Sequence, residues 1–212
     1  ITAVILLVFR DTILGFVTGI HVSTSKNLKI GDWIGIPKYN IEGNIQDINL
    51  LTTKIVNFDK TISTIPTYDL LSTEIRNHQV MYEGSSRRIK RSIYFNIKSF
   101  KFVDDEFYEK VKDINLISEY LDRKLREIAE SKKNIPHAER IINGQQLTNI
   151  GLFRNYVLNY LKNNPKVDQD EIVLVRQLEI SPQGMPLEIY CFANKAELVD
   201  YERIQADIFD HI

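Results

Sequence analysis

The sequence predicts an α+β protein in which an apolar segment leads into a small β-domain and then into a second domain of strands and helices. Three observations carry this prediction. Residues 1–22 are apolar except for a short polar interruption. Residues 28–66 contain short β-branched runs separated by turn residues. From residue 87 onward the expected order is strand, helices, strand, strand, helix, which is typical of an antiparallel α+β sandwich.

The apolar segment has two interpretations. Ile1 to Phe9 and Ile13 to Val22 are interrupted by Arg10 and Asp11, and each half has about nine apolar residues where a bilayer core needs ~20. The segment also lacks the basic start of a secretory signal. In the first interpretation the segment is a buried helical hairpin or an exposed apolar edge of a soluble domain. In the second it is the last helix of a longer membrane protein, which bends near Arg10 and leaves the bilayer.

Turn residues divide the rest of the chain. Gly84-Ser85-Ser86 is the best linker. Before it, Asp59-Lys60 predicts a two-residue hairpin turn, and the strands form a small barrel or half-barrel. These strands are expected at residues 28–30, 33–36, 45–50, 54–58 and 61–65.

The second domain begins with the clearest alternating strand, which extends over residues 87–98. Asp104 is the expected N-cap of a helical region that breaks near Asn115, and Thr148 or Asn149 is expected to cap the next helix. The remaining elements are expected as strands at 172–180 and 187–193 and a helix from Leu198.

Composition excludes several functional classes. The chain has 212 residues with 27 Lys and Arg against 28 Asp and Glu, and this near balance argues against a generic nucleic-acid binder. A single cysteine, Cys191, excludes a disulfide scaffold and a cysteine-based zinc site. The four histidines lack metal-ligand spacing, and phosphate-binding and nucleophile motifs are absent from the sequence. We therefore expect no enzyme, no metal and no cofactor.

One basic cluster remains, the run Arg87-Arg88-Ile89-Lys90-Arg91. Such a run fits nucleic acid, anionic lipid, an electrostatic filter for ions, or simply a solvated strand face. Alternation assigns Arg88 and Lys90 to the polar face of the strand. Arg91 falls on the apolar face, where it needs a partner or an exposed position at a subunit interface.

Several motifs together resemble the small-conductance mechanosensitive channel family of bacterial membranes. They are Phe9 to Gly15, Val17 to Ile20, Gly31-Asp32-Trp33, Glu42 to Ile48, and Thr64-Ile65-Pro66-Thr67 with Thr67 in place of the usual Asn. The miniconductance branch is the most similar, through residues 87–92, 147–151, 175–178 and 205–212.

The resemblance implies three regions. Residues 1–23 are expected to be the end of a transmembrane pore helix and its extension, 24–84 a small Sm-like β-barrel, and 85–212 a ferredoxin-like α+β vestibule domain with a helical insertion at about 104–146. It also implies a homo-heptamer in the bacterial inner membrane, with most of this chain cytoplasmic. The implied partners are further copies of the chain, membrane lipid, permeating ions and small solutes, with no nucleic acid and no cofactor.

The resemblance also implies site residues. Leu7 corresponds to the inner apolar gate ring, while the outer ring position falls on the small Ala3, so Phe9 is a further gate candidate. Arg10 and Asp11 lie where the family's pore helix kinks.

Two further groups complete the implied site. Gly15 and Gly19 allow close helix packing between subunits. The basic cluster of Arg87, Arg88, Lys90 and Arg91 is expected to act on vestibule electrostatics or subunit contacts.

The expected function is a channel subunit that opens under membrane tension and releases ions and solutes during hypo-osmotic shock. The alternative is a soluble β-barrel plus α+β module that binds RNA or protein.

Overall fold

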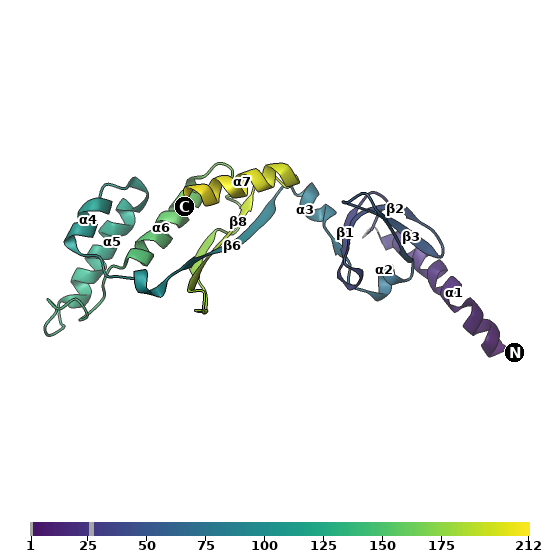
Figure 1. Ribbon diagram of the computed structural model, residues 1–212, viewed down its shortest axis with the longest axis horizontal. Coiled ribbons are helices and arrows are strands. Elements are labelled where there is room, and N and C mark those ends of the chain that lie inside the picture. Colours follow the sequence, from purple (N-terminus) through teal and green to yellow (C-terminus); the bar gives the residue numbers. More distant parts are fainter. Residues whose placement is uncertain (1, 26–27) are drawn as a thin grey trace. The chain divides into compact units, whose positions relative to one another are not determined.

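The computed structural model describes residues 2–25 and 28–212, with side chains from 7–21 and from 28 onward. The chain divides into two compact units, Ile1–Gly84 and Ser85–Ile212, both visible in Figure 1. Each combines helices with an antiparallel sheet, which confirms the α+β class.

The first unit begins with α1, Thr2–Ser25, which continues as helix through Arg10 and Asp11. Among the described helices, none is both long and apolar enough to cross a membrane.

A five-stranded antiparallel sheet follows, in the order β4-β3-β2-β1-β5. The first unit also contains a 3₁₀ turn at Pro37–Tyr39 and two short helices, α2 (Asp69–Ser72) and α3 (Gln79–Glu83). The strands are β1 (Trp33–Ile36), β2 (Ile41–Ile48), β3 (Thr52–Asn57), β4 (Ile62–Pro66) and β5 (Arg76–Asn77). Alternation along these strands builds a core of Ile34, Ile36, Ile45, Ile55, Ile65 and Leu70.

The strand expected at residues 28–30 is not formed. The Lys29 backbone N–H donates to the Asp32 carboxylate at 3.0 Å, and the Asp32 N–H donates to the Lys29 carbonyl at 3.1 Å. These bonds close a turn before β1, because an Asp side chain competes with a strand partner for nearby backbone donors.

A buried threonine pair ties β3 to the segment after β4. The hydroxyls of Thr53 and Thr67 lie 3.0 Å apart, and Thr67 Oγ1 donates to the Asn49 carbonyl at 2.7 Å. Both threonines are fully buried. Thr67, which replaces the usual Asn of the resembled motif, thus satisfies its polar atom inside the core.

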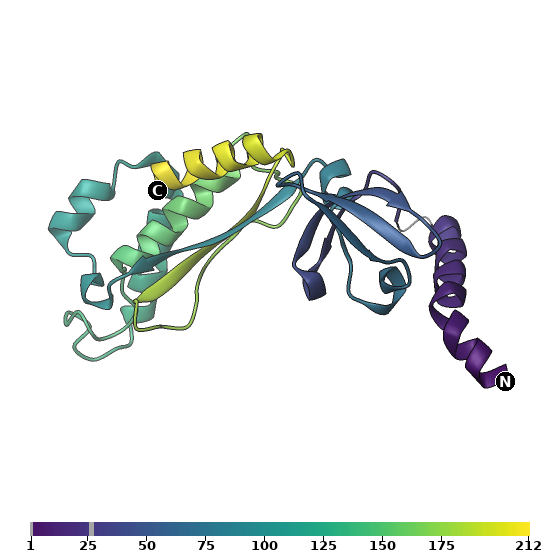
Figure 2. The ribbon, with the colours of Figure 1, turned by 45° about the vertical axis from the view of Figure 1, so that its right-hand side comes forward.

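The second unit places two helices on one face of a three-stranded antiparallel sheet of order β6-β8-β7, as Figure 2 shows. The strands are β6 (Arg87–Phe95), β7 (Leu174–Gln177) and β8 (Met185–Ala193), and the helices are α6 (Asn149–Asn163) and α7 (Leu198–His211). Their shared core includes Ile89, Val157, Leu161, Leu187, Ile189, Cys191, Ile204 and Ile208.

Two further helices, α4 (Asp105–Val111) and α5 (Asn115–Lys132), lie between β6 and α6 in the chain. Asp104 caps α4 by accepting the Phe107 N–H at 2.8 Å, and Thr148 caps α6 by accepting the Gly151 N–H at 3.2 Å, so both expected caps are confirmed. α5 packs against α6 through a separate core of Ile117, Leu121, Ile128, Leu147 and Leu152.

Candidate functional site

The side chains of α1 are largely uncovered. Leu7 is 73% exposed and Phe9 is 53% exposed, and Arg10 and Asp11 are also exposed. The backbone of Ala3 is helical, but its side chain lies outside those that the structure describes. Further exposed apolar side chains on this helix are Val8, Ile13, Phe16, Val17 and Ile20. An apolar surface of this extent on one helix is typical of a segment that another chain or lipid covers.

The two glycines of α1 have different surroundings. A Cβ on Gly15 would lie 1.9 Å from the Leu50 carbonyl oxygen, so α1 rests directly on the turn between β2 and β3. Beside it, Thr18 is buried and its hydroxyl donates to the Leu14 carbonyl at 2.7 Å. A Cβ on Gly19 would meet no atom within 4 Å among those described. Gly15 therefore has a packing role inside its own unit, and Gly19 leaves an open helix surface.

The basic cluster on β6 is split by the pleat of the strand. Ile89 is buried in the core that β6 shares with α7. Arg87 and Arg91 lie on the same side of the strand as Ile89. The Arg87 guanidinium lies 4.4 Å from the Tyr201 ring centroid, and that of Arg91 lies 4.7 Å from the Phe209 ring centroid. The partner that Arg91 needs is thus an aromatic ring of α7, and the contact is a cation–π interaction.

Arg88 and Lys90 lie on the opposite face of the sheet, which no helix of the second unit covers. The Arg88 guanidinium lies 5.8 Å from the Tyr190 ring centroid. Lys90 Nζ lies 3.9 Å from Glu188, whose carboxylate also accepts from Arg176 at 2.6 Å. The Glu188 residue is only 4% exposed although its face is open, because side chains of β6 and β7 surround it.

Sequence reasoning missed Arg176, Glu188, Tyr201 and Phe209. Glu188 gave a usable signal, since it stands between Leu187 and Ile189 in an alternating run and so had to face away from the core. The strand partners of a residue depend on register, which a single sequence does not specify.

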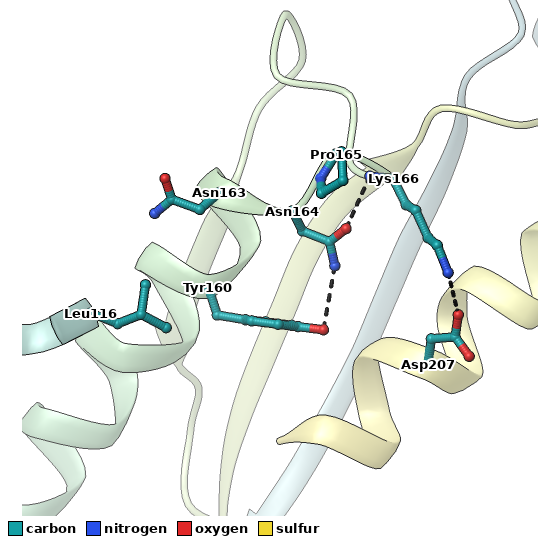
Figure 3. Close-up of a pocket in the computed structure, with 7 residues that line it drawn as sticks. All are labelled: Leu116, Tyr160, Asn163, Asn164, Pro165, Lys166 and Asp207. Atoms are coloured by element: carbon teal, nitrogen blue, oxygen red, sulfur yellow. Dashed lines mark hydrogen bonds and ion pairs between the residues drawn. The ribbon is translucent and has the colours of Figure 1, made fainter. Parts of the chain in front are cut away.

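A cavity of 340 Å³ opens beside the C-terminal end of α6, as Figure 3 shows. The Asn164 amide donates to the Tyr160 hydroxyl at 3.3 Å, and burial raises the pKa of this phenol, which stays protonated at neutral pH. Lys166 pairs with Asp207 at 2.5 Å, so the two charges in the lining neutralise each other. The lining residues are Leu116, Tyr160, Asn163, Asn164, Pro165, Lys166 and Asp207.

A metal-binding site needs several His, Cys, Asp or Glu side chains close together. Within residues 2–25 and 28–212, no three His, Cys, Asp or Glu side chains gather where they could hold a metal ion.

Comparison with known proteins identifies the first unit. Residues 11–80 match the sequence family described as "Mechanosensitive ion channel, beta-domain". The chain is 24% identical over 200 residues to the low conductance mechanosensitive channel YnaI of Escherichia coli, covering 94% of this chain and 44% of YnaI. It is 35% identical over 71 residues to the small-conductance mechanosensitive channel MscMJ of Methanocaldococcus jannaschii, covering 34% of this chain and 20% of MscMJ. The chain thus spans less than half the length of these curated relatives.

Solved structures share the fold across the whole chain. Arabidopsis thaliana MSL1 superposes with a TM-score of 0.64 at 16% identity, covering 99% of this chain and 57% of MSL1. Helicobacter pylori MscS in its closed state gives 0.57 at 14% identity, covering 99% of this chain and 61% of that one. The domain match, the relatives and the shared fold agree: residues 11–80 match the β-domain of mechanosensitive ion channels, and the chain as a whole is similar to proteins of the MscS family.

Proposed function

We propose that this chain is part of a mechanosensitive channel subunit that opens under membrane tension and releases ions and small solutes during hypo-osmotic shock. In this proposal α1 is the end of a pore-lining transmembrane helix in a homo-heptamer of the bacterial inner membrane. The first unit's sheet is an Sm-like β-barrel domain, residues 24–84. Residues 85–212, with a helical insertion at about 104–146, form a ferredoxin-like vestibule domain, and most of the chain is cytoplasmic.

One observation carries the proposal. The matched β-domain, residues 11–80, includes the second half of a helix whose large apolar side chains are exposed along most of its described length. Only Gly15 and Thr18 of this stretch are buried within the unit. Copies of α1 around a pore, together with lipid, would cover these side chains.

The mechanism is a change of wetting. A ring of Leu7 side chains in a narrow pore excludes water and so stops ions, whose hydration shells cannot follow them. Tension favours the state with the larger area in the membrane, which widens the ring until water enters. No covalent chemistry is required, and no enzyme activity is proposed.

The remaining residues have narrower proposed roles. Ala3 and Phe9 flank the Leu7 ring, and Arg10 and Asp11 remain tolerable only where they face water or the interface. The cluster of Arg87, Arg88, Lys90 and Arg91 acts on permeating ions or on subunit contacts rather than on nucleic acid. Residues 205–212 favour the miniconductance branch.

The alternative is a soluble module that binds RNA or protein. It is not favoured, because YnaI and MscMJ are both named as channels and the chain has no net positive charge.

The test is electrical recording from membrane patches that contain the full-length protein. We expect currents that appear only above a threshold suction, and we expect Leu7→Ser to lower that threshold, because a hydroxyl recruits water into the dry ring. Leu198→Ser, on an exposed site of the second unit, is the matched control and should leave the threshold unchanged. Patches without tension-activated current would contradict the proposed function, whereas an unchanged threshold in Leu7→Ser would contradict only the gate assignment.

A further inference from the structure

The second unit has one sheet face without a helix, and its composition is that of a protein interface. In this unit α6 and α7 both pack on the other face. We call the uncovered side the open face. Its even-numbered β6 residues pair in register with even-numbered residues of β8. It comprises Arg88, Lys90, Ser92, Tyr94, Leu174, Arg176, Pro186, Glu188, Tyr190 and Phe192.

The open face carries three aromatic side chains along its length. Tyr94 is 56% exposed, and the rings of Tyr190 and Phe192 meet edge to face with centroids 5.8 Å apart. Tyrosine and arginine are the residues most enriched where protein interfaces bind strongly. The cavity at the C-terminal end of α6 includes no residue of this face, and ligand sites are concave, which favours a protein over a small molecule as the partner of the open face.

The open face also carries an excess of positive charge. Glu188 is its one carboxylate, and that carboxylate is shared by Lys90 and Arg176. Arg88 stacks near Tyr190 and forms no ion pair within the described residues. Three cations against one anion leave two positive charges, which a covering surface has to balance.

The outer side of α7 has the complementary properties. Tyr201, Ile204 and Ile208 are buried against the sheet. The opposite side of the helix therefore points away from the sheet. Its exposed residues are Val199, Glu202, Arg203, Ala206 and Asp210. Together they are named the α7 stripe below.

The α7 stripe combines an apolar residue, a small residue, two acids and Arg203, whose guanidinium pairs with Asp200 at 3.4 Å. Val199 is 60% exposed, and Ala206 allows a close approach. Neither Glu202 nor Asp210 forms an ion pair within the part of the chain that the structure describes. The helix as a whole has four acids against one arginine, so its outer side is negative where the open face is positive.

We propose that the open face of one copy is covered by the α7 stripe of a second copy. The two surfaces lie on opposite sides of the same layered unit, so one copy cannot bring them together. Association is therefore head to tail, and repeated head-to-tail contacts close into a ring when the rotation permits. The inference rests on the proposed self-assembly and names the surfaces that make the contact.

Disulfide trapping in the full-length protein tests the contact. Ser92→Cys lies on the open face and Ala206→Cys on the α7 stripe. In one chain the sheet and the ~10 Å thickness of a helix separate these positions, beyond the ~7 Å Cα distance that a disulfide spans. Cys191 does not compete, because it is buried and burial raises the pKa of its thiol to about 12.

We expect the doubly substituted protein to give a ladder of covalent dimers and higher oligomers on mild oxidation. Ser118→Cys with Ala206→Cys is the control, since Ser118 is exposed on α5, and it should remain a single band. A single band from the test pair, in protein that still assembles and conducts under tension, overturns the inference and leaves the channel proposal intact. Protein that stays monomeric and gives no tension-activated current overturns both.

Charge reversal gives a second, independent readout. Arg88→Glu alone and Glu202→Lys alone should each weaken subunit association about tenfold or more, because each sets like charges against each other. The two together should restore it. Lys98→Glu, an exposed lysine beyond β6, is the control and should have no effect. A double variant as weak as either single one would contradict the pairing.

Discussion

At the scale of residues, substitution by alanine is expected to change stability in opposite directions at the two glycines of α1. Gly15→Ala forces a Cβ to within 1.9 Å of a backbone carbonyl that cannot rotate away, so we expect the first unit to lose roughly 1–3 kcal/mol of stability. Gly19→Ala meets no described atom within 4 Å and should gain up to about 1 kcal/mol from helix propensity. Denaturant unfolding of the intact protein measures both, and a loss in Gly19→Ala would indicate that subunits pack on that glycine.

Local chemistry made some single residues predictable and left others hidden. The sequence predicts the cap at Asp104 and narrows the cap of α6 to Thr148 or Asn149, because a cap needs only a side-chain oxygen and the next three residues. The position of Arg91 on the apolar face also followed from alternation. Its partner Phe209 lies more than a hundred residues away, and nothing local to either residue indicates that contact.

At the scale of elements, arginine–aromatic contacts and a hydrogen bond join α7 to β6 in addition to their shared apolar core. Tyr201 lies under Arg87 and donates its hydroxyl to the Arg88 carbonyl at 3.0 Å, and Phe209 lies under Arg91. We expect Arg91→Ala to destabilise the second unit by about 0.5–1 kcal/mol, the range for an exposed cation–π contact.

The same unfolding experiment contains its own control. Lys98→Ala removes a positive charge just beyond β6 without an aromatic partner of its own among the described contacts, and it should change the unfolding free energy by less than about 0.5 kcal/mol. Equal losses in the Arg91 and Lys98 variants would show that charge, rather than the ring contact, is responsible.

Elements with strong patterns were predictable, and short ones were not. The alternation of β6 and the helical periodicity of α6 and α7 are long enough to override neighbouring signals. Residues 67–86 instead contain the four-residue α2, the two-residue β5 and the five-residue α3. Elements this short form mainly because tertiary contacts hold them, since an isolated turn of helix does not offset its nucleation cost.

At the scale of the whole molecule, Cys191 links the stability of the second unit to alkaline pH. Burial raises the pKa of its thiol from 9.0 to about 12, so folding favours the protonated form. The contribution is complete below pH 9 and is lost as the pH rises toward 12, with a slope of at most about 1.4 kcal/mol per pH unit. Tyrosines and lysines titrate in the same range, so the quantity to measure is the difference from Cys191→Ala. Parallel stability curves for the two proteins would contradict this linkage.

The division of the chain into two units predicts where proteases cut the folded molecule. Ser85 has a positive φ of 57° at the junction, and cleavage requires a segment that can leave its surroundings locally. The long connection formed by residues 133–146 is also expected to open locally, because its Ile141 and Ile142 are exposed. A protease of broad specificity at low concentration should therefore cut first near 84–86 and within 133–146, and mass spectrometry of the early fragments identifies the sites. Strands 33–66 should resist, because their backbone groups are paired across the sheet. First cuts confined to that sheet, with both connections intact, would contradict the division into two stable units.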